Sequence, residues 1–185
     1  GFDNAEQEQS VKKRGSQMLQ RVIDHPGPLK NKAIKIKKDL PNYYLSLEDN
    51  IILCGKIDWL EYFPADDSVH IIDFKTGRND ESITSLQLPI YRLLVHNCQQ
   101  RSVSRASYWY LDRDNDPIAV TLPSLEEAHD KVLEIAKQVK TARLLGEYVC
   151  RKGGCFACRP FEKIIKGEAE FVGVGGYSQD LYIIP

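Results

Sequence analysis

Apolar residues recur along this chain with two spacings, one typical of helices and one typical of strands. The helical spacing predicts three long helices, at residues 5–24, 86–97 and 124–145. Two-residue alternation and short β-branched or aromatic runs predict strands at residues 51–62, 69–75, 104–111 and 117–122, preceded by two alternating pieces within 33–47. A compact loop at 150–160, a short helix and a glycine-rich tail follow. This order of elements predicts an α/β fold whose core is a mixed sheet.

The length and composition of the chain narrow its class. A chain of 185 residues, 42% of them hydrophobic and 28% charged, can form one globular domain and is neither fibrous nor disordered. We therefore expect a single domain over residues 1–185, with the cysteine-containing loop at its C-terminal end. No apolar stretch approaches the ~18 residues that span a bilayer, so no membrane association is predicted. Because the chain begins with Gly1 rather than methionine, we interpret it as a processed product or a piece of a longer protein.

The cysteine content indicates the cellular compartment, whereas the net charge does not decide whether the protein binds nucleic acid. The net charge of −1 gives no general argument for nucleic-acid binding, so any basic surface must be local. Five cysteines without a secretory signal favour free thiols and the reducing cytoplasm. One local basic segment has two interpretations, a patch that contacts phosphates or a solvated edge that discourages strand pairing. Its lysines are Lys30, Lys32, Lys35, Lys37 and Lys38.

Two acids and a lysine lie at the ends of neighbouring predicted strands. Asp58 ends a Gly-Lys-Ile-Asp sequence, and Asp73 follows the apolar run of the next strand. Lys75 comes two residues after Asp73, so both side chains should share one face of the strand. Taken alone, Asp58 could be a water-facing acid, and Asp73 with Lys75 a simple ion pair. The alternative is that the acids hold a divalent cation beside the lysine, as in a metal-dependent phosphodiesterase.

A polar pair lies on the helix that follows. Gln87 and Tyr91 are four residues apart, so they share one face of the predicted helix at 86–97. They could be a capping glutamine and a core tyrosine, or a pair that orients Lys75 or contacts a DNA backbone.

Three ordered motifs together resemble a known family. Gly55-Lys56-Ile57-Asp58, Asp73-Phe74-Lys75-Thr76-Gly77 and Gln87-Leu88-Pro89-Ile90-Tyr91 are similar to the G-x-x-D, D-x-K-T-G and Q-x-x-x-Y motifs of the RecB-like branch of the PD-(D/E)XK nuclease superfamily. Each motif is unspecific alone, but the three in this order on these elements are specific. The resemblance is strong over residues 55–91 and weak elsewhere.

The resemblance implies a fold, a cofactor and roles for these residues. The fold would be a restriction-endonuclease-like core, with a central mixed sheet flanked by helices. Mg²⁺ or Mn²⁺ would bind Asp58, Asp73 and the carbonyl of Phe74. Lys75 would position or help deprotonate the attacking water and stabilise the developing charge. Gln87 and Tyr91 would support the site near the DNA.

The chain departs from the family pattern in two places. RecB-like members often carry a metal-binding histidine on the first helix, but residues 15–19 contain none. Many superfamily members also have a glutamate upstream of the first aspartate, where this chain has its lysine-rich segment. Glu48 belongs to a predicted turn and is not assigned to the site. A single-metal site, or a third ligand from elsewhere in the chain, remains open.

Three cysteines near the C-terminus form a second candidate site. Cys150, Cys155 and Cys158 have the C-x4-C-x2-C spacing of part of an iron–sulfur motif, and several RecB-like nucleases resemble this arrangement. A [4Fe–4S] cluster or a zinc ion would need a fourth ligand. Cys54 and Cys98 are not assigned to it, so the fourth ligand could lie in a part of the protein outside this chain.

We therefore expect a Mg²⁺-dependent DNA exonuclease of recombination or repair. The resemblance also implies a helicase domain or subunit as a partner. The alternative is a catalytically degenerate nuclease fold that binds DNA or a helicase. A phosphodiesterase acting on RNA or on a small nucleotide is a third hypothesis.

Overall fold

The computed structural model describes residues 2, 4–148, 150 and 153–185. Its chain divides into two compact units, Asn4–Val139 and Lys140–Pro185, the latter grouped with Gly1–Asp3. The single domain expected for residues 1–185 stays a prediction. Elements run in the order α1 (Ala5–Asp24), η1 (Gly27–Lys30), β1 (Asn42–Ser46), β2 (Ile51–Cys54), β3 (Trp59–Phe63), β4 (Ser68–Lys75), α2 (Gln87–Cys98), β5 (Ser102–Tyr110), β6 (Ile118–Ala119), α3 (Leu125–Leu145), α4 (Arg159–Ile165), β7 (Glu170–Val174) and β8 (Asp180–Ile183).

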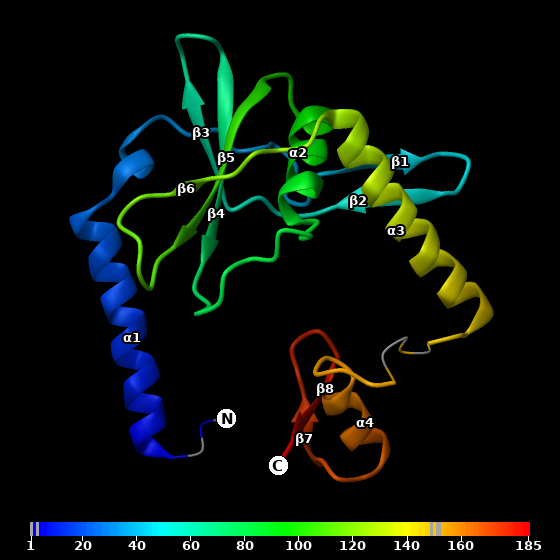
Figure 1. The fold of residues 1–185 in the computed structure, drawn as a ribbon. Helices are drawn as coiled ribbons and strands as arrows, with labels where there is room; N and C mark the ends of the chain where they lie inside the picture. The colour runs from blue at the N-terminus through cyan, green and yellow to red at the C-terminus, as the bar shows by residue number, and fades with distance from the viewer. Residues whose placement is uncertain (1, 3, 149, 151–152) are drawn as a thin grey trace. The chain divides into compact units, whose positions relative to one another are not determined.

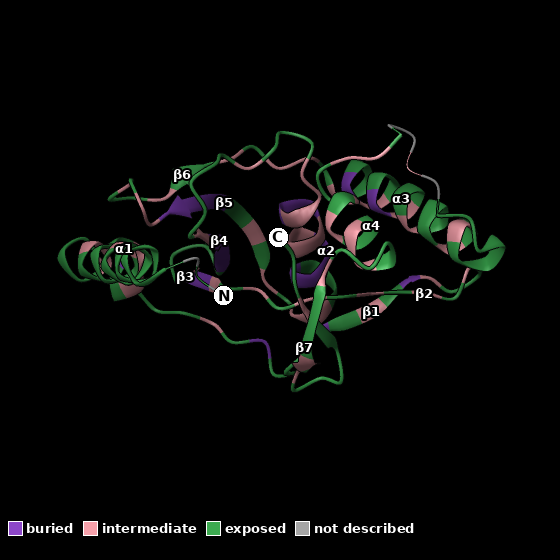
Figure 2. Ribbon diagram, turned by 90° about the horizontal axis from the view of Figure 1, so that it is seen from below, coloured by how far each residue is buried: buried purple, intermediate pink, exposed green. Residues whose placement is uncertain are grey.

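A mixed four-stranded sheet forms the centre of the larger unit, as predicted. Its strand order is β3-β4-β5-β6, with β4 and β5 parallel and the other pairs antiparallel. Helix α2 makes the crossover between β4 and β5 that a parallel pair requires (Figure 1). Strand β4 is buried from its first residue through Asp73, and Figure 2 shows β4 and β5 among the buried parts of the chain. The central strand therefore carries the site acid into the interior.

Helix α2 lies between two apolar clusters. On one side, Leu88 and Val95 pack against Val69 and Ile71 of β4 and against buried residues of β5. On the other side, Leu93 packs with residues of the β1–β2 hairpin and of α3. Burial on both sides fixes this helix against the sheet, so the residues in its first turn are held beside the end of β4.

Helix ends follow the sequence signals. Asn4 caps α1 by accepting a hydrogen bond from the backbone N–H of Gln7 at 2.8 Å. The capping box predicted for α3 is present: the N–H of Ser124 donates to Glu127 Oε2 at 2.7 Å, and the N–H of Glu127 donates to Ser124 Oγ at 3.1 Å. The predicted bounds of both helices are confirmed to within a residue. Among the described residues, no helix is long and apolar enough to cross a membrane.

The single strand predicted at 51–62 is wrong. The structure divides it into β2, which pairs with β1 in a separate hairpin, and β3, which joins the central sheet. The break begins at Gly55, where an added Cβ atom would lie 3.0 Å from Leu94 Cδ1 of α2. Only a residue without a side chain lets the backbone pass this close to the helix. The break leaves Asp58 just ahead of β3.

Three other parts of the prediction differ from the structure. The strand predicted at 117–122 is reduced to β6, which covers only Ile118–Ala119. The alternating piece at 33–36 forms only an isolated bridge, between Ala33 and Glu61. The glycine-rich tail is not irregular, because β7 and β8 pair as an antiparallel hairpin from Glu170 opposite Ile183. The bridge and the hairpin both join segments that local composition did not connect.

A buried polar trio crosses the sheet within β3, β4 and β5. His70 Nδ1 lies 2.8 Å from Glu61 Oε2, and His70 Nε2 lies 2.8 Å from Ser107 Oγ. Burial lowers the pKa of His70 below its ordinary value, against the raising effect of Glu61. A histidine whose pKa is lowered by folding stabilises the protein above its unfolded pKa, and that stability is lost as pH falls.

We therefore expect His70 to make the fold acid-sensitive. Between pH 7 and about pH 5, the melting temperature of the wild type should fall more than that of His70→Gln, which cannot gain a proton. The exposed His96 supplies the matched control, and His96→Gln should keep the wild-type pH dependence. Equal pH dependence of the wild type and His70→Gln would contradict this expectation.

Candidate nuclease site

The two predicted acids lie opposite each other at the open end of the β3–β4 pair. In the antiparallel register, Trp59 pairs with Ile72, so the next position outward places Asp58 across from Asp73. Asp58 is exposed, and its Oδ2 atom accepts a hydrogen bond from the backbone N–H of Phe74 at 3.0 Å. Asp73 is only 1% exposed. The turn before β3 thus brings an exposed carboxylate beside a buried one.

Burial and a like charge disturb the ionisation of Asp73. Its pKa is raised, first by burial and further by the neighbouring Asp58, while Lys75 acts in the opposite direction. A buried carboxylate beside another acid is therefore costly to keep charged. A cation placed between Asp58 and Asp73 would relieve that cost.

Lys75 is surrounded by three oxygen atoms. Its Nζ atom lies 2.9 Å from Asp73 Oδ2 and 2.8 Å from Glu81 Oε2. It also donates a hydrogen bond to Gln87 Oε1. Burial acts to lower the pKa of Lys75, but the contacts with Glu81 and Asp73 outweigh it and raise the pKa well above its ordinary value. Lys75 is therefore a fixed positive charge at the end of β4.

The glutamine and tyrosine of α2 complete this network. Gln87 Nε2 donates to Asp73 Oδ1 at 2.7 Å and to the Tyr91 hydroxyl at 3.2 Å. Because the same amide accepts from Lys75, Gln87 holds the acid and the lysine in one arrangement. Burial raises the pKa of Tyr91, so its hydroxyl keeps its proton. The structure brings together the five side chains that the motifs singled out: Asp58, Asp73, Lys75, Gln87 and Tyr91.

Two further residues contact the site without having been predicted. Glu81 comes from the loop between β4 and α2 and pairs with Lys75. Arg14 of α1 donates to the carbonyl of Thr76 and pairs with Asp112 at 3.1 Å. Glu81 is one of several polar residues in an irregular loop, so no periodic signal could have marked it. Arg14 occupies the helix region where the family pattern led us to look for a histidine.

The oxygen ligands fit a hard divalent cation. Asp58 and Asp73 offer carboxylates from neighbouring strands, and carboxylates are the ligands that Mg²⁺ and Mn²⁺ prefer. Within the described ranges, no third acid or histidine comes near enough to both aspartates to complete a three-residue group. The carbonyl of Phe74 as a ligand stays a prediction. The protein side chains alone thus supply two ligands.

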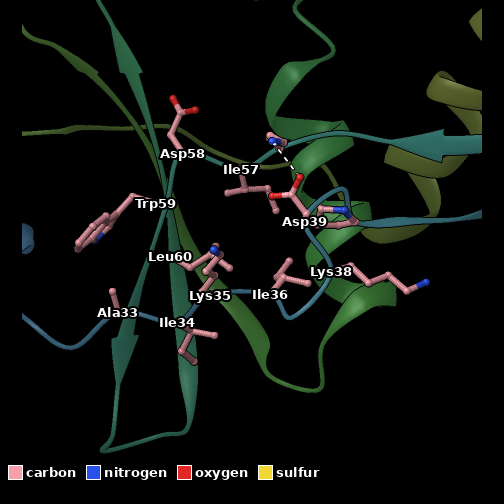
Figure 3. A pocket seen from close by; sticks show the side chains of 12 residues that line it. Ala33, Ile34, Lys35, Ile36, Lys38, Asp39, Ile57, Asp58, Trp59 and Leu60 are labelled. Carbon is pink, nitrogen blue, oxygen red and sulfur yellow. Dashed lines mark hydrogen bonds and ion pairs between the residues drawn. The ribbon is translucent and has the colours of Figure 1, made fainter.

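A groove beside Asp58 contains part of the lysine-rich segment. Its volume is about 360 Å³, and Lys35, Lys38 and Lys56 contribute to its wall together with Trp59. Figure 3 shows Lys35 and Lys38 extending from one segment, and Asp58 at the margin of the same groove with its carboxylate pointing away from these lysines. Lys56 forms a mostly exposed ion pair with Asp39 at 3.4 Å. Positive side chains therefore line the approach to one of the two site acids.

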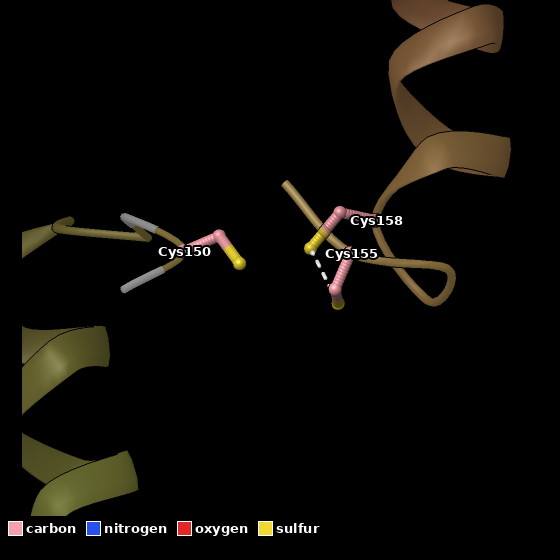
Figure 4. Close-up of side chains that lie close together, drawn as sticks. All are labelled: Cys150, Cys155 and Cys158. Carbon is pink, nitrogen blue, oxygen red and sulfur yellow. Dashed lines mark hydrogen bonds between the residues drawn. The ribbon is translucent and has the colours of Figure 1, made fainter. Parts of the chain in front are cut away.

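The three C-terminal cysteines meet within the smaller unit (Figure 4). The Sγ atoms of Cys150, Cys155 and Cys158 lie within 4.8 Å of one another, and all three are free thiols. Gly153 and Gly154 have φ angles of +64° and +103°, which permit the tight turn between the first cysteine and the other two.

The backbone of this cysteine loop favours a thiolate. Hydrogen bonds from the backbone of Cys158 and Ala157 are the largest influences on Cys155, and they lower the pKa of its thiol. The hydrogen bond between the two thiols raises the pKa of Cys158. Because metals bind thiolates, backbone donors to Cys155 are the surroundings that a metal site needs. Three thiols provide three of the four ligands that zinc or an iron–sulfur cluster requires.

Comparison with known proteins agrees with this geometry. The family model described as "PD-(D/E)XK nuclease superfamily" matches residues 4–161, which include every element of the sheet and both aspartates. No curated protein and no solved structure matched the chain.

Proposed function

The chain belongs to the PD-(D/E)XK nuclease superfamily, and on this premise we propose that it is a metal-dependent nuclease that cleaves DNA. The observation that carries the proposal is the buried Asp73, which is linked to Lys75 and Gln87 and lies opposite Asp58. Burying a carboxylate costs free energy, and buried acids with a specific charged partner are concentrated at functional sites.

Each side chain of the site has a separate proposed role in hydrolysis. Asp58 and Asp73 would hold Mg²⁺ or Mn²⁺, which supplies a polarised phosphate and a more acidic water when bound. Lys75 places a permanent positive charge where the pentacovalent phosphate gains negative charge. Gln87 keeps Lys75 and Asp73 aligned, and Tyr91 in turn holds Gln87. These contacts of Gln87 exist before substrate arrives, so the acid and the lysine are already aligned with each other.

The groove beside Asp58 is the proposed path of the DNA backbone. Lys35, Lys38 and Lys56 lie along it and can pair with successive phosphates. The other interpretation is that the lysine-rich segment is a solvated edge beside β3, where its charges discourage pairing with another strand. Phosphate contacts predict that binding weakens with salt and that each lysine removed makes this dependence less steep.

The narrower assignments rest on the motif resemblance. We propose that the protein is RecB-like, that it degrades DNA from an end, and that it acts in repair or recombination with a helicase domain or subunit. Free thiols at all five cysteines are compatible with work in the cytoplasm.

The cysteine group is the proposed site of a structural cofactor, either a [4Fe–4S] cluster or zinc. We expect protein purified without oxygen to contain iron and sulfide with visible absorbance, or zinc without it. Cys158→Ser should lower the affinity for the metal by about tenfold or more, because losing a ligand costs at least as much as losing an outer-shell partner, and the metal content of the purified protein should fall. Cys98→Ser, at the end of α2, is the matched control and should retain the metal. Equal metal content in both variants would contradict the assignment.

A panel of nucleic acids tests the activity and its direction. The protein is incubated with linear and covalently closed circular DNA, single- and double-stranded, and with RNA, in Mg²⁺, Mn²⁺ or EDTA. The proposal predicts loss of linear DNA in either metal, survival of circles and no reaction in EDTA. Cleavage of circles would show an endonuclease, and cleavage of RNA alone would show a different phosphodiesterase.

One observation favours a second candidate, a degenerate nuclease fold that binds DNA. Among the described residues, Asp58 and Asp73 are joined by no third acid or histidine. That candidate predicts DNA binding without cleavage of any substrate in any metal.

A further inference from the structure

Three oxygen atoms of the protein already surround the Lys75 ammonium group, two in ion pairs and one in a hydrogen bond. A lysine ammonium group has three N–H donors. Around Nζ lie Asp73 Oδ2 at 2.9 Å, Glu81 Oε2 at 2.8 Å and the Gln87 side-chain oxygen. The number of oxygens thus equals the number of donors. A phosphate that approaches Lys75 has to compete with these three oxygens for the ammonium group.

Of the three partners, Glu81 is the one that can leave. Asp73 is buried, and Gln87 is tied to both Asp73 and Tyr91. The Glu81 side chain is 27% exposed and comes from the irregular loop between β4 and α2. Its backbone N–H donates to the Tyr110 hydroxyl at 2.9 Å, so the loop stays anchored while the side chain turns.

We infer that the Glu81 carboxylate occupies the position of a DNA phosphate oxygen, and that bound DNA displaces it from Lys75. This inference rests on the proposed nuclease function. A carboxylate and a phosphate both offer anionic oxygens to an ammonium, so one can replace the other without leaving Lys75 unpaired. Glu81 is thus a positioning residue, which holds Lys75 toward Asp73 until the substrate arrives.

The displacement predicts that removing the charge of Glu81 tightens DNA binding. Glu81→Gln keeps the size of the side chain but competes less with phosphate, so the Kd for a fluorescent single-stranded or duplex oligonucleotide in EDTA should fall about fivefold. Asp80→Asn is the matched control. It removes the same charge one residue away, from an acid that pairs with Arg113 instead of Lys75. This control should change Kd by less than about twofold, because salt screens a charge at this exposed position.

A double-mutant cycle identifies Lys75 as the group that Glu81 shields. In a Lys75→Met background, Glu81→Gln should no longer tighten binding, because the shared partner is gone. Tighter binding that persists in this background, or an equal Kd for wild type and Glu81→Gln, would overturn the inference.

The remaining outcomes separate this inference from the proposed function. Loss of cleavage by Glu81→Gln, with a higher Mg²⁺ requirement, would make Glu81 a metal ligand and overturn the displacement. DNA binding with the predicted variant effects, but no cleavage by the wild type, would overturn the nuclease activity and support the displacement. Absence of DNA binding by every variant would overturn both.

Discussion

Asp73→Asn should abolish DNA cleavage while leaving the protein folded. Asparagine keeps an oxygen for the amide of Gln87 but removes the buried negative charge that would hold a cation. Loss of about 4 kcal/mol of transition-state stabilisation corresponds to about a 10³-fold slower reaction. The measurement is the single-turnover rate on linear DNA in saturating Mg²⁺ or Mn²⁺.

The thermal stability of Asp73→Asn shows whether a loss of cleavage comes from the site alone or from unfolding of the protein. Burial raises the pKa of Asp73, so the charged carboxylate costs free energy in the folded state. The melting temperature of the variant should therefore equal or exceed that of the wild type. Near-wild-type cleavage by Asp73→Asn would show that the reaction does not depend on this acid.

Lys75→Met should have the second largest effect, slowing cleavage by about 10²- to 10³-fold, the loss typical of removing one group that stabilises developing charge. Methionine retains the length of the side chain but lacks the charge that we propose stabilises the scissile phosphate. Lys137→Met is the matched control, because Lys137 forms an ion pair with Asp49 at 2.9 Å outside the site network. The control variant should cleave DNA at the wild-type rate.

Lys75→Met should also move the pH dependence of the remaining activity. Lys75 lowers the pKa of Asp73 against the effect of burial, so removing the lysine raises that pKa further. Because the site needs Asp73 ionised, the rate falls as pH drops through this pKa, and the acidic limb should lie at higher pH in the variant. An acidic limb at the same pH as in the wild type would show that Lys75 does not influence the ionisation of Asp73.

Local patterns predicted much of the fold. The spacing of apolar residues located α1 and α3, and the Ser124–Glu127 capping box is present. The alternation of strand side chains also predicted that Asp73 and Lys75 share a face, and their ion pair confirms it. These features depend on neighbours within a few residues, which a single sequence displays directly.

Features that depend on distant contacts were not predictable in this way. The chain breaks at Gly55 because Leu94 of α2 lies against it, a contact between residues far apart in the sequence. Likewise, Glu81 meets Lys75 only because the loop before α2 folds back over the end of β4. The motifs therefore located the acids and the lysine, whereas the partner that limits access to the lysine became visible only in three dimensions.

The most direct test of the central claim is metal-dependent cleavage measured side by side for two proteins. Wild type and Asp73→Asn are incubated with end-labelled linear DNA, with Mg²⁺ or Mn²⁺ and with EDTA, and the labelled products are followed with time. The metal site at Asp58 and Asp73 predicts cleavage by the wild type in metal only, and none by the variant. Equal cleavage by both proteins, or no cleavage by the wild type in either metal, would contradict it.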